Sequence, residues 1–155
     1  HPYFNVLDTL TNEELANISE NVEIYEIDKY ILKELQNEYV LSNIKTAAWL
    51  VLGDMGEVGN QGPEFHREVG RYADEKGVQK LFTLGDLSKE AVAAYQASAT
   101  QGHVAQHFAD VSELCIELNK SLQARKNHEE VTLLVKGSRF MRMERVVKAL
   151  AEEMH

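Results

Sequence analysis

The sequence predicts an α/β fold, a Rossmann-like and mostly parallel sheet covered by helices, with a helical appendage at the N-terminus. Three observations favour it. Short apolar runs alternate four times with stretches of helical periodicity over residues 46–155. Two of these runs end in glycine, as strands that lead into a tight turn do. Residues 1–44 instead hold no glycine and show mainly helical spacing.

Each strand and helix has its own signal. The first expected strand, Ala47–Gly53, is a continuous apolar run, which is typical of a strand buried on both faces. Pro63 and Gly77 are expected to open and close the next helix, because proline fits the first helical turn and glycine ends helices. Asp110 and Glu113 form a capping box for a later helix. The other strands are expected at Lys80–Gly85, His103–Phe108 and Val131–Val135, and the other helices at Ser88–Ser98 and around Met143–Leu150.

Composition restricts the class of protein. The chain has 155 residues, 44% hydrophobic and 26% charged, as expected for a globular domain with its own core. The single cysteine, Cys115, excludes an intramolecular disulfide and is expected in the core. No apolar run reaches the roughly 20 residues that span a bilayer, and no signal peptide is recognisable, so we expect a cytoplasmic protein. The net charge of −9 argues against nucleic acid or an anionic membrane as partner.

The N-terminal segment differs in charge from the rest. Residues 1–44 hold nine acidic and two basic residues, whereas residues 45–155 hold 16 acidic and 14 basic ones. Helical spacing, opened by a capping box, covers residues 11–20 and returns over residues 30–40. Residues 22–27 fit a short strand or a loop. We therefore predict an acidic, mainly helical appendage over residues 1–44 and an α/β domain over residues 45–155.

The turn after the first strand is a candidate ligand site, because open parallel sheets bind ligands at the carboxyl ends of their strands. Its glycines, from Gly53 to Gly59, have the spacing G-x-x-G-x-x-G rather than the G-x-G-x-x-G of dinucleotide-binding turns. The turn also holds Asp54 and Glu57, whose carboxylates would repel a pyrophosphate. A dinucleotide site is therefore disfavoured, and the alternative is a tight turn capped by its own acids.

A second candidate is the turn Lys136-Gly137-Ser138-Arg139, which lies between the last strand and the last helix. Two cations at the carboxyl end of a strand, beside a helix N-terminus, form a natural anion site. A solvated basic turn would have the same pattern. No G-x-x-x-x-G-K-[ST] run occurs anywhere, so the chain has no phosphate-binding P-loop of its own.

The histidines predict no metal site. His66 lies one turn into a helix, where a lone histidine is more often a packed or capping residue than a catalyst. His103 and His107 are four residues apart on an expected strand and would share a face only loosely. No His-Glu-x-x-His or Cys-x-x-Cys spacing occurs, so we expect no metal ligand in this chain.

Four motifs follow one another in a recognisable order. They are Gly53-Asp54-Met55-Gly56-Glu57-Val58-Gly59, His66-Arg67-Glu68-Val69-Gly70, His107-Phe108-Ala109-Asp110, and Lys136-Gly137-Ser138-Arg139 with Met143-Glu144. The series resembles the C-terminal domain of the Mur ligase family, which builds peptidoglycan, in its D-alanyl-D-alanine-adding branch. The resemblance covers about residues 46–152. The Lys-Gly-Ser-Arg turn separates this branch from its relatives, so the match is specific.

The resemblance implies a piece of a three-domain cytoplasmic ligase that uses ATP and Mg²⁺. Such an enzyme activates a carboxylate of UDP-N-acetylmuramoyl-tripeptide as an acyl phosphate, and the amine of D-alanyl-D-alanine then attacks it. The central domain, which supplies the P-loop and the magnesium ligands, is expected to be missing here, as is the N-terminal domain. The chain alone is therefore expected to hold no cofactor and no catalytic residue and to be inactive, and to contribute substrate contacts and closure of the cleft.

The resemblance also implies roles for individual residues. Lys136 and Arg139 would hold the carboxylate of D-alanyl-D-alanine or the phosphoryl group. The full set of implied substrate contacts is Lys136, Ser138, Arg139, Asp86 and Ser88, and the implied cleft-lining residues are Asp54, Glu57 and His66.

Upstream, the chain departs from the family. Members carry an Ala-Tyr-Asn-Ala-Asn-Pro-like segment before the Gly-Asp-Met turn, where this chain reads Ile24-Tyr25-Glu26-Ile27-Asp28-Lys29-Tyr30. Residues 1–44 are therefore expected to be foreign to the ligase: an engineered fusion, a joined partner peptide or an unusual extension. The alternative function is a non-catalytic interaction module or fusion that displays this segment. An independent nucleotide-binding protein is disfavoured by the missing P-loop.

Overall fold

The computed structural model describes residues 22–27, 47–55, 59–98, 100, 102–125 and 131–153. The strands are β1 (Val22–Ile27), β2 (Ala47–Gly53), β3 (Val78–Leu84), β4 (Val104–Phe108) and β5 (Val131–Lys136). The helices are α4 (Gly62–Glu75), α5 (Lys89–Ala97), α6 (Val111–Gln123) and α7 (Glu144–Glu153), with 3-10 turns η1 (Gly59–Gln61) and η3 (Arg139–Met141).

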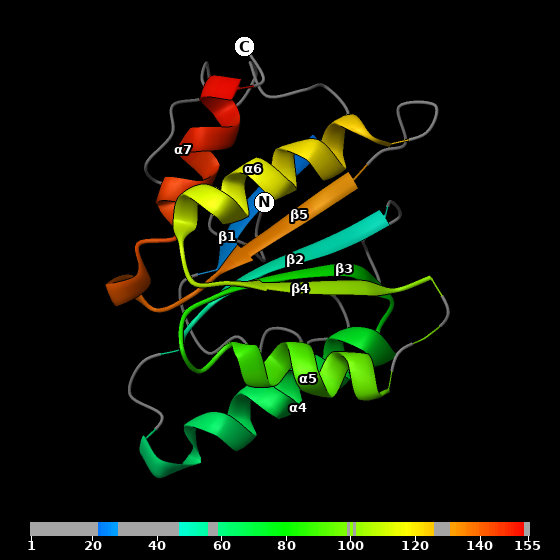
Figure 1. The fold of residues 1–155 in the computed structure, drawn as a ribbon, viewed down its shortest axis with the longest axis vertical. Helices are drawn as coiled ribbons and strands as arrows, with labels where there is room; N and C mark the ends of the chain where they lie inside the picture. Colours follow the sequence, from blue (N-terminus) through cyan, green and yellow to red (C-terminus); the bar gives the residue numbers. More distant parts are fainter. Residues whose placement is uncertain are drawn as a thin grey trace.

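The strands form one sheet in the order β1-β5-β2-β3-β4, and all four pairings are parallel. Helices α6 and α7 cover one face of the sheet and α4 and α5 cover the other (Figure 1). The predicted α/β fold is therefore confirmed. Within the described residues, no helix has the length and apolar character needed to cross a bilayer.

The core has two halves, one on each face of the sheet. Successive strand residues point to opposite faces, so in β2 Trp49 and Val51 pack with α6 and α7, whereas Leu50 and Leu52 pack with α4 and α5. All seven residues of β2 are buried, as its unbroken apolar run predicts. Cys115 is partly buried against the α6/α7 half of the core, close to its predicted place. Burial raises the pKa of its thiol, an effect that the charge of Arg145 opposes.

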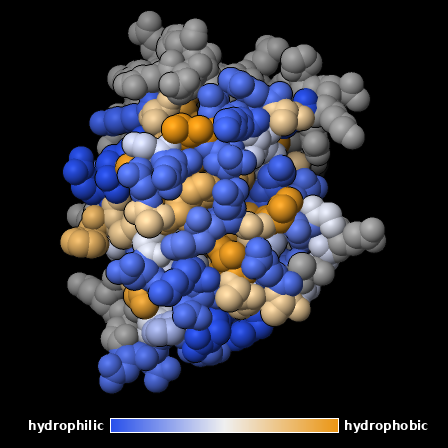
Figure 2. All heavy atoms as spheres, viewed as in Figure 1, coloured by the Kyte–Doolittle hydropathy of each residue, from blue (hydrophilic) through white to orange (hydrophobic). Residues whose placement is uncertain are grey.

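The surface agrees with this layering. In the view of Figure 2, hydrophilic residues dominate the described surface, and hydrophobic residues gather only in small separate groups between them. Single exposed apolar residues are normal on a folded protein. Among the described residues, the large hydrophobic side chains most open to solvent are Val104, Ile116 and Phe140.

The helix boundaries follow local signals. The carboxylate of Asp110 accepts hydrogen bonds from the N–H groups of Ser112 and Glu113 and so caps α6, as predicted. Pro63 lies at the first turn of α4, and Gly77, with φ of +88°, follows its end. The fixed φ of proline suits the first helical turn, and glycine, which has no Cβ, tolerates the positive φ at the helix end.

Residues 22–27 correct the predicted domain division. They form β1, which pairs with β5 along its length, from Val22 opposite Val131 to Ile27 opposite Lys136. A division at residue 45 therefore does not separate the sheet from an appendage. Of the two alternatives left open for residues 22–27, a strand or a loop, the strand is therefore confirmed. Its two glutamates suit an edge strand, where charged residues are common. The helices predicted at 11–20 and 30–40 lie outside the described residues.

Candidate functional site

The turns that follow β2, β3 and β5 meet at the carboxyl edge of the sheet, and Asp54 joins all three. Its carboxylate accepts hydrogen bonds from the N–H groups of Leu87 (3.0 Å) and Ser88 (2.7 Å), in the turn after β3. Its backbone carbonyl oxygen accepts the N–H of Ser138 (3.0 Å), in the turn after β5. The edge is therefore one connected assembly rather than three separate loops.

The carboxylate of Asp54 acts as the cap of α5. Ser88, the residue before this helix, makes no capping bond with its own side chain. Its hydroxyl instead donates to the carbonyl oxygen of Leu84 at 2.7 Å, and the whole residue is buried. Ser88 therefore differs from its expected role as a substrate contact: its side chain is turned into the protein and occupied there. The alternative predicted for the turn after β2, that it is capped by its own acids, does not describe Asp54, whose carboxylate accepts N–H groups of the neighbouring turn instead.

Three glycines and one methionine set the spacing of this edge. A Cβ on Gly53 would lie 2.5 Å from the sulfur of Met143, and one on Gly137 would lie 2.6 Å from its Cγ. Gly85, with φ of +111°, approaches Asp54 so closely that a Cβ there would lie 2.5 Å from the carboxyl carbon. Such distances are far below van der Waals contact, so the turns can meet only because these positions lack side chains.

The basic turn has one buried cation. Lys136 is fully buried and engaged in an interaction within the chain. Its register partner Leu52 belongs to the α4/α5 half of the core, so Lys136 lies on that face. The expectation of two accessible cations at the mouth of a cleft therefore does not fit Lys136. Ser138 is partly buried, and Arg139 opens the η3 turn, whose next residue, Phe140, is 89% exposed.

The other residues implied as substrate contacts or cleft-lining residues differ in their exposure. Asp86 is exposed in the turn after β3, open to a ligand. Asp54 is partly buried and occupied as described, and Glu57 lies outside the described residues. Among the described residues, no group of three or more His, Cys, Asp or Glu side chains could hold a metal ion.

His66 is a packed, capping histidine. It is fully buried, with Nε2 3.1 Å from the N–H of Met55 and Nδ1 2.6 Å from the carbonyl oxygen of Gly62. Since Nε2 accepts the Met55 proton, Nδ1 must carry the ring proton and donate it to Gly62. His66 therefore ties the start of α4 to the turn after β2, and it does not line an open cleft.

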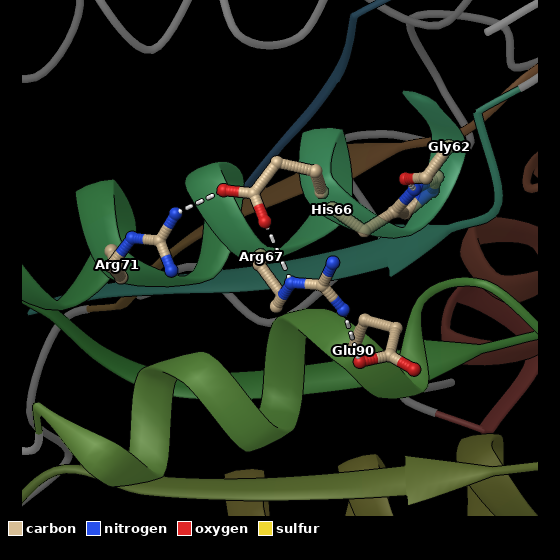
Figure 3. Close-up of polar contacts among 6 residues, drawn as sticks. Gly62, His66, Arg67, Arg71 and Glu90 are labelled. Carbon is tan, nitrogen blue, oxygen red and sulfur yellow. Dashed lines mark hydrogen bonds and ion pairs between the residues drawn. The ribbon is translucent and has the colours of Figure 1, made fainter. Parts of the chain in front are cut away.

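A surface network begins one residue later. Arg67 pairs with Glu64 (2.8 Å) and with Glu90 of α5 (3.0 Å), and Arg71 pairs with Glu64 (2.7 Å) (Figure 3). Hydrogen bonds from Arg67 and Arg71 lower the pKa of Glu64. Exposed pairs of this kind contribute little to stability. The network orients α4 on α5 at the surface, while His66 points into the protein on the other side of the helix (Figure 3).

His107 also lies at this edge. The sequence placed it on an expected strand and in one of the four motifs but assigned it no role in the site. It lies near the end of β4, with Nδ1 2.7 Å from the hydroxyl of the buried Thr83 in β3. Burial lowers its pKa; the carboxylate of Asp54 opposes this, Lys89 adds to it, and Asp86 opposes it. A threonine within the buried second half of β3, among Leu81, Phe82 and Leu84, was the available signal, since buried hydroxyls need a partner. His103 lies at the far end of β4 and pairs with Asp74 (2.7 Å).

Comparisons with known proteins agree on one family. A model described as "Mur ligase, glutamate ligase domain" matches residues 14–139. The match includes residues 14–44, so the prediction that the whole acidic segment is foreign to the family was wrong for that part.

Among curated relatives, the chain is similar to UDP-N-acetylmuramoyl-tripeptide–D-alanyl-D-alanine ligase of Escherichia coli (strain K12), with 37% identity over 113 residues, 73% of this chain and 23% of that protein. The ligase of the same name from Buchnera aphidicola subsp. Acyrthosiphon pisum is 33% identical over 104 residues, 67% of this chain and 21% of that protein. The chain thus spans between a fifth and a quarter of the length of these relatives.

Solved structures show the same fold. MurF from Acinetobacter baumannii superposes with a TM-score of 0.71 at 22% identity, covering 90% of this chain and 30% of that one. The MurF ligase of Thermotoga maritima in complex with ADP has a TM-score of 0.65 at 18% identity, covering 96% and 32%. The chain therefore belongs to the Mur ligase family, of which it carries the C-terminal, glutamate ligase domain.

Proposed function

We propose that this chain is the C-terminal domain of an ATP-dependent ligase that adds D-alanyl-D-alanine to UDP-N-acetylmuramoyl-tripeptide. The proposal is supported by curated relatives that carry this activity in their names and match two thirds or more of the chain. The observation that carries it is the hydrogen bond from Ser138 to Asp54 (3.0 Å), which holds the Lys-Gly-Ser-Arg turn at the carboxyl edge of the sheet. Ligands of open parallel sheets bind at this edge.

Three residues of the edge are the proposed substrate contacts. D-alanyl-D-alanine is a zwitterion, so its site needs a cation for the carboxylate and an anion or acceptor for the ammonium. We assign Arg139 to the carboxylate, because a guanidinium binds carboxylates with two parallel hydrogen bonds. The exposed Asp86 is assigned to the ammonium group and Ser138 to a polar contact beside Arg139. Lys136 and Ser88 are buried, and we assign them to the support of the edge.

The complete enzyme would combine this domain with two others. The chain has no P-loop sequence, so ATP and Mg²⁺ would be held by the central domain. Transfer of the γ-phosphoryl group would activate the tripeptide carboxylate, and the dipeptide amine would then displace phosphate to form the amide. This domain would position the amine and close the cleft, which supplies orientation and excludes water. ATP and a UDP-linked substrate place the reaction in the cytoplasm.

A chimaera tests this function. The matched C-terminal region of the Escherichia coli relative is replaced by residues 14–155 of this chain, and phosphate release is measured with and without D-alanyl-D-alanine. We expect dipeptide-dependent ligation, which the same enzyme truncated before this region should lack. Arg139→Ala should then lower kcat/KM for the dipeptide, by an amount that corresponds to a loss of about 2–3 kcal/mol of transition-state stabilisation. The value of kcat/KM for ATP should change less. A folded chimaera no better than the truncated enzyme would contradict the proposal.

The isolated chain provides the complementary measurement. Without a P-loop it should neither hydrolyse ATP nor bind it, and calorimetry with ATP and Mg²⁺ should give no heat of binding. Micromolar, magnesium-dependent binding would contradict this expectation. The alternative of an interaction module that displays residues 1–44 is not favoured, because the family match begins at residue 14 and residues 22–27 form a strand of the sheet.

A further inference from the structure

We infer that Asp54 is a positioning residue of this site, which fixes the turn that carries Asp86 relative to the turn that carries Ser138 and Arg139. Its side chain holds the first turn and its backbone carbonyl oxygen holds the second. The substrate contacts named here rest on the proposed function. The coupling of the two turns through Asp54 is a property of the chain itself and can be measured without it.

Asp54 is committed to this role by its surroundings. Its Oδ1 accepts both Ser88 (2.7 Å) and Leu87 (3.0 Å), and its Oδ2 lies 3.1 Å from the same Leu87 nitrogen. Both N–H groups lie just before α5, which begins at Lys89, and the helix dipole favours a negative charge there. Gly85 lies so close on another side that a Cβ built there would be 2.5 Å from the carboxyl carbon. The carboxylate is therefore directed at the protein, and a substrate ammonium would have to compete with two backbone donors for it.

The second turn is held from both sides. The N–H of Ser138 donates to the Asp54 carbonyl oxygen, and the carbonyl oxygen of Ser138 accepts the N–H of Met141 (2.9 Å). Met143, only 3% exposed, packs over Gly53 and Gly137 and presses the turn onto the end of β2. A Cβ built on Gly137 would lie 3.2 Å from the Cα of Gly53. The turn therefore has no room to shift toward β2.

These contacts have a consequence for binding. The carboxylate fixes the backbone of Asp54, and the carbonyl oxygen of that same backbone sets the position of Ser138. Movement of the turn after β3 should therefore be transmitted to the turn after β5 through one residue. Catalytic and binding groups must be held within fractions of an ångström, and a displacement of about 1 Å can cost on the order of 100-fold in rate. Loss of the Asp54 carboxylate should impair a site it does not touch.

The coupling is tested in the chain alone by amide hydrogen exchange. In Asp54→Ala, we expect the amides of Leu87 and Ser88 to exchange faster, and the Ser138 amide to do so by about tenfold although its own acceptor is unchanged. Asp54→Asn, which keeps one oxygen acceptor, should show a smaller effect. Asp110→Ala is the matched control, because Asp110 caps α6 with two N–H bonds but joins no second turn.

Two outcomes overturn the inference. If Leu87 and Ser88 lose protection while Ser138 keeps it, Asp54 is a helix cap and nothing more. If Asp110→Ala deprotects Ser138 equally, the effect is a general loss of stability. Should Asp54→Ala fail to fold, Asp54→Asn carries the same comparison.

The chimaera adds a functional reading. Asp54→Ala should raise KM for D-alanyl-D-alanine about tenfold or more, with smaller changes in kcat and in KM for ATP, and Asp54→Asn should raise it less. Asp110→Ala should leave all three constants unchanged. An Asp54→Ala enzyme with normal KM would contradict positioning. If the unsubstituted chimaera does not ligate, the proposed function fails, and the exchange experiment alone still decides the role of Asp54.

Discussion

Lys136 and Ser88 show how the same sequence pattern can place a side chain outside or inside the protein. Both lie at the carboxyl edge, where substrate contacts are expected, and both are fully buried. A long amphipathic side chain such as lysine can cover apolar surface with its methylene groups. A serine just before a helix can bond the preceding turn instead of a ligand. Position along the sheet therefore does not decide accessibility.

The burial of Lys136 predicts a structural role. Lys136→Ala removes a large enclosed side chain and leaves its surroundings unfilled, so the free energy of unfolding should fall by about 2–5 kcal/mol. Lys89→Ala, which truncates an exposed lysine at the start of α5, is the matched control and should change it by less than about 0.5 kcal/mol. Urea denaturation measures both. Equal stability of the two variants would show that Lys136 is accessible in solution.

The buried Asp74, paired with the partly buried His103, gives a pH dependence. Burial favours the protonated form of Asp74, yet the N–H of Thr100 (3.0 Å) and His103 (2.7 Å) outweigh it and hold the pKa of Asp74 below its usual range. A depressed folded pKa means that the carboxylate stabilises the protein above its unfolded pKa, about 4, and that this stabilisation is lost as pH falls through the folded pKa.

Asp74→Asn should therefore lower the free energy of unfolding at pH 7, by about 1–3 kcal/mol. The difference from the unsubstituted protein should shrink as pH falls below about 4, because the unfolded state then takes up a proton that the folded carboxylate does not. The loss is complete only once the pH lies below the lowered folded pKa, where the carboxylate is protonated in both states. Chemical denaturation between pH 3 and pH 7, with the exposed Asp86→Asn as control, measures this. A difference that stays constant over this range would show that the charge of Asp74 contributes nothing.

At the scale of elements, α4 and α5 pack unusually closely. A Cβ built on Gly70 would lie 2.1 Å from the carbonyl oxygen of Ala91, which belongs to the backbone of α5. Small residues at a helix crossing allow such an approach, and backbone atoms cannot move aside as a flexible side chain can. The His66-Arg67-Glu68-Val69-Gly70 motif thus combines a buried histidine, a surface arginine and the contact point of two helices.

Gly70→Ala separates helix propensity from packing. Alanine is favoured over glycine inside a helix by about 1 kcal/mol, but here the clash with Ala91 should dominate. We expect a net destabilisation of about 1–3 kcal/mol, measured by thermal and urea unfolding. Glu68→Ala, at an exposed position of the same helix, should be nearly neutral. A Gly70→Ala protein that is more stable than the unsubstituted one would mean that α5 can retreat at little cost.

At the scale of the whole molecule, the sheet contains strands from the acidic segment 1–44 and from residues 45–155. β5 is buried at all six positions and lies between β1 and β2, so removal of β1 would turn a central strand into an edge. An exposed apolar edge strand offers unpaired backbone groups to other molecules. The acidic segment is thus part of the fold at residues 22–27.

Deletion of residues 1–44 should therefore lower the midpoint of urea unfolding and promote self-association. The four remaining strands and their helices should keep a cooperative transition, because the two halves of the core survive. Deletion of residues 1–13, which precede the family match, is the control and should have a smaller effect. Unfolding and light scattering measure both truncations. Identical midpoints would show that β1 adds nothing to the cooperative unit.

The sequence alone predicted the elements and the edge of the sheet where the turns meet. Apolar runs and helical periodicity are local patterns, and they located β2 to β5 and α4 to α7 within a few residues. The parallel architecture then followed from their alternation, and with it the edge where the turns meet. The ordered motifs pointed to the family, which the family match confirmed.

Only the tertiary structure decided which side chains of this edge are buried and bonded within the protein and which are exposed. The Asp54 carboxylate meets Leu87 and Ser88 more than thirty residues away, and His66 meets Met55 through a buried ring. The pairing of β1 with β5 joins residues more than a hundred positions apart. Local periodicity reports which face of an element is apolar, but it carries no information on the partner that packs there. That partner is fixed by the packing of the whole chain, which is where burial and hydrogen bonding are settled.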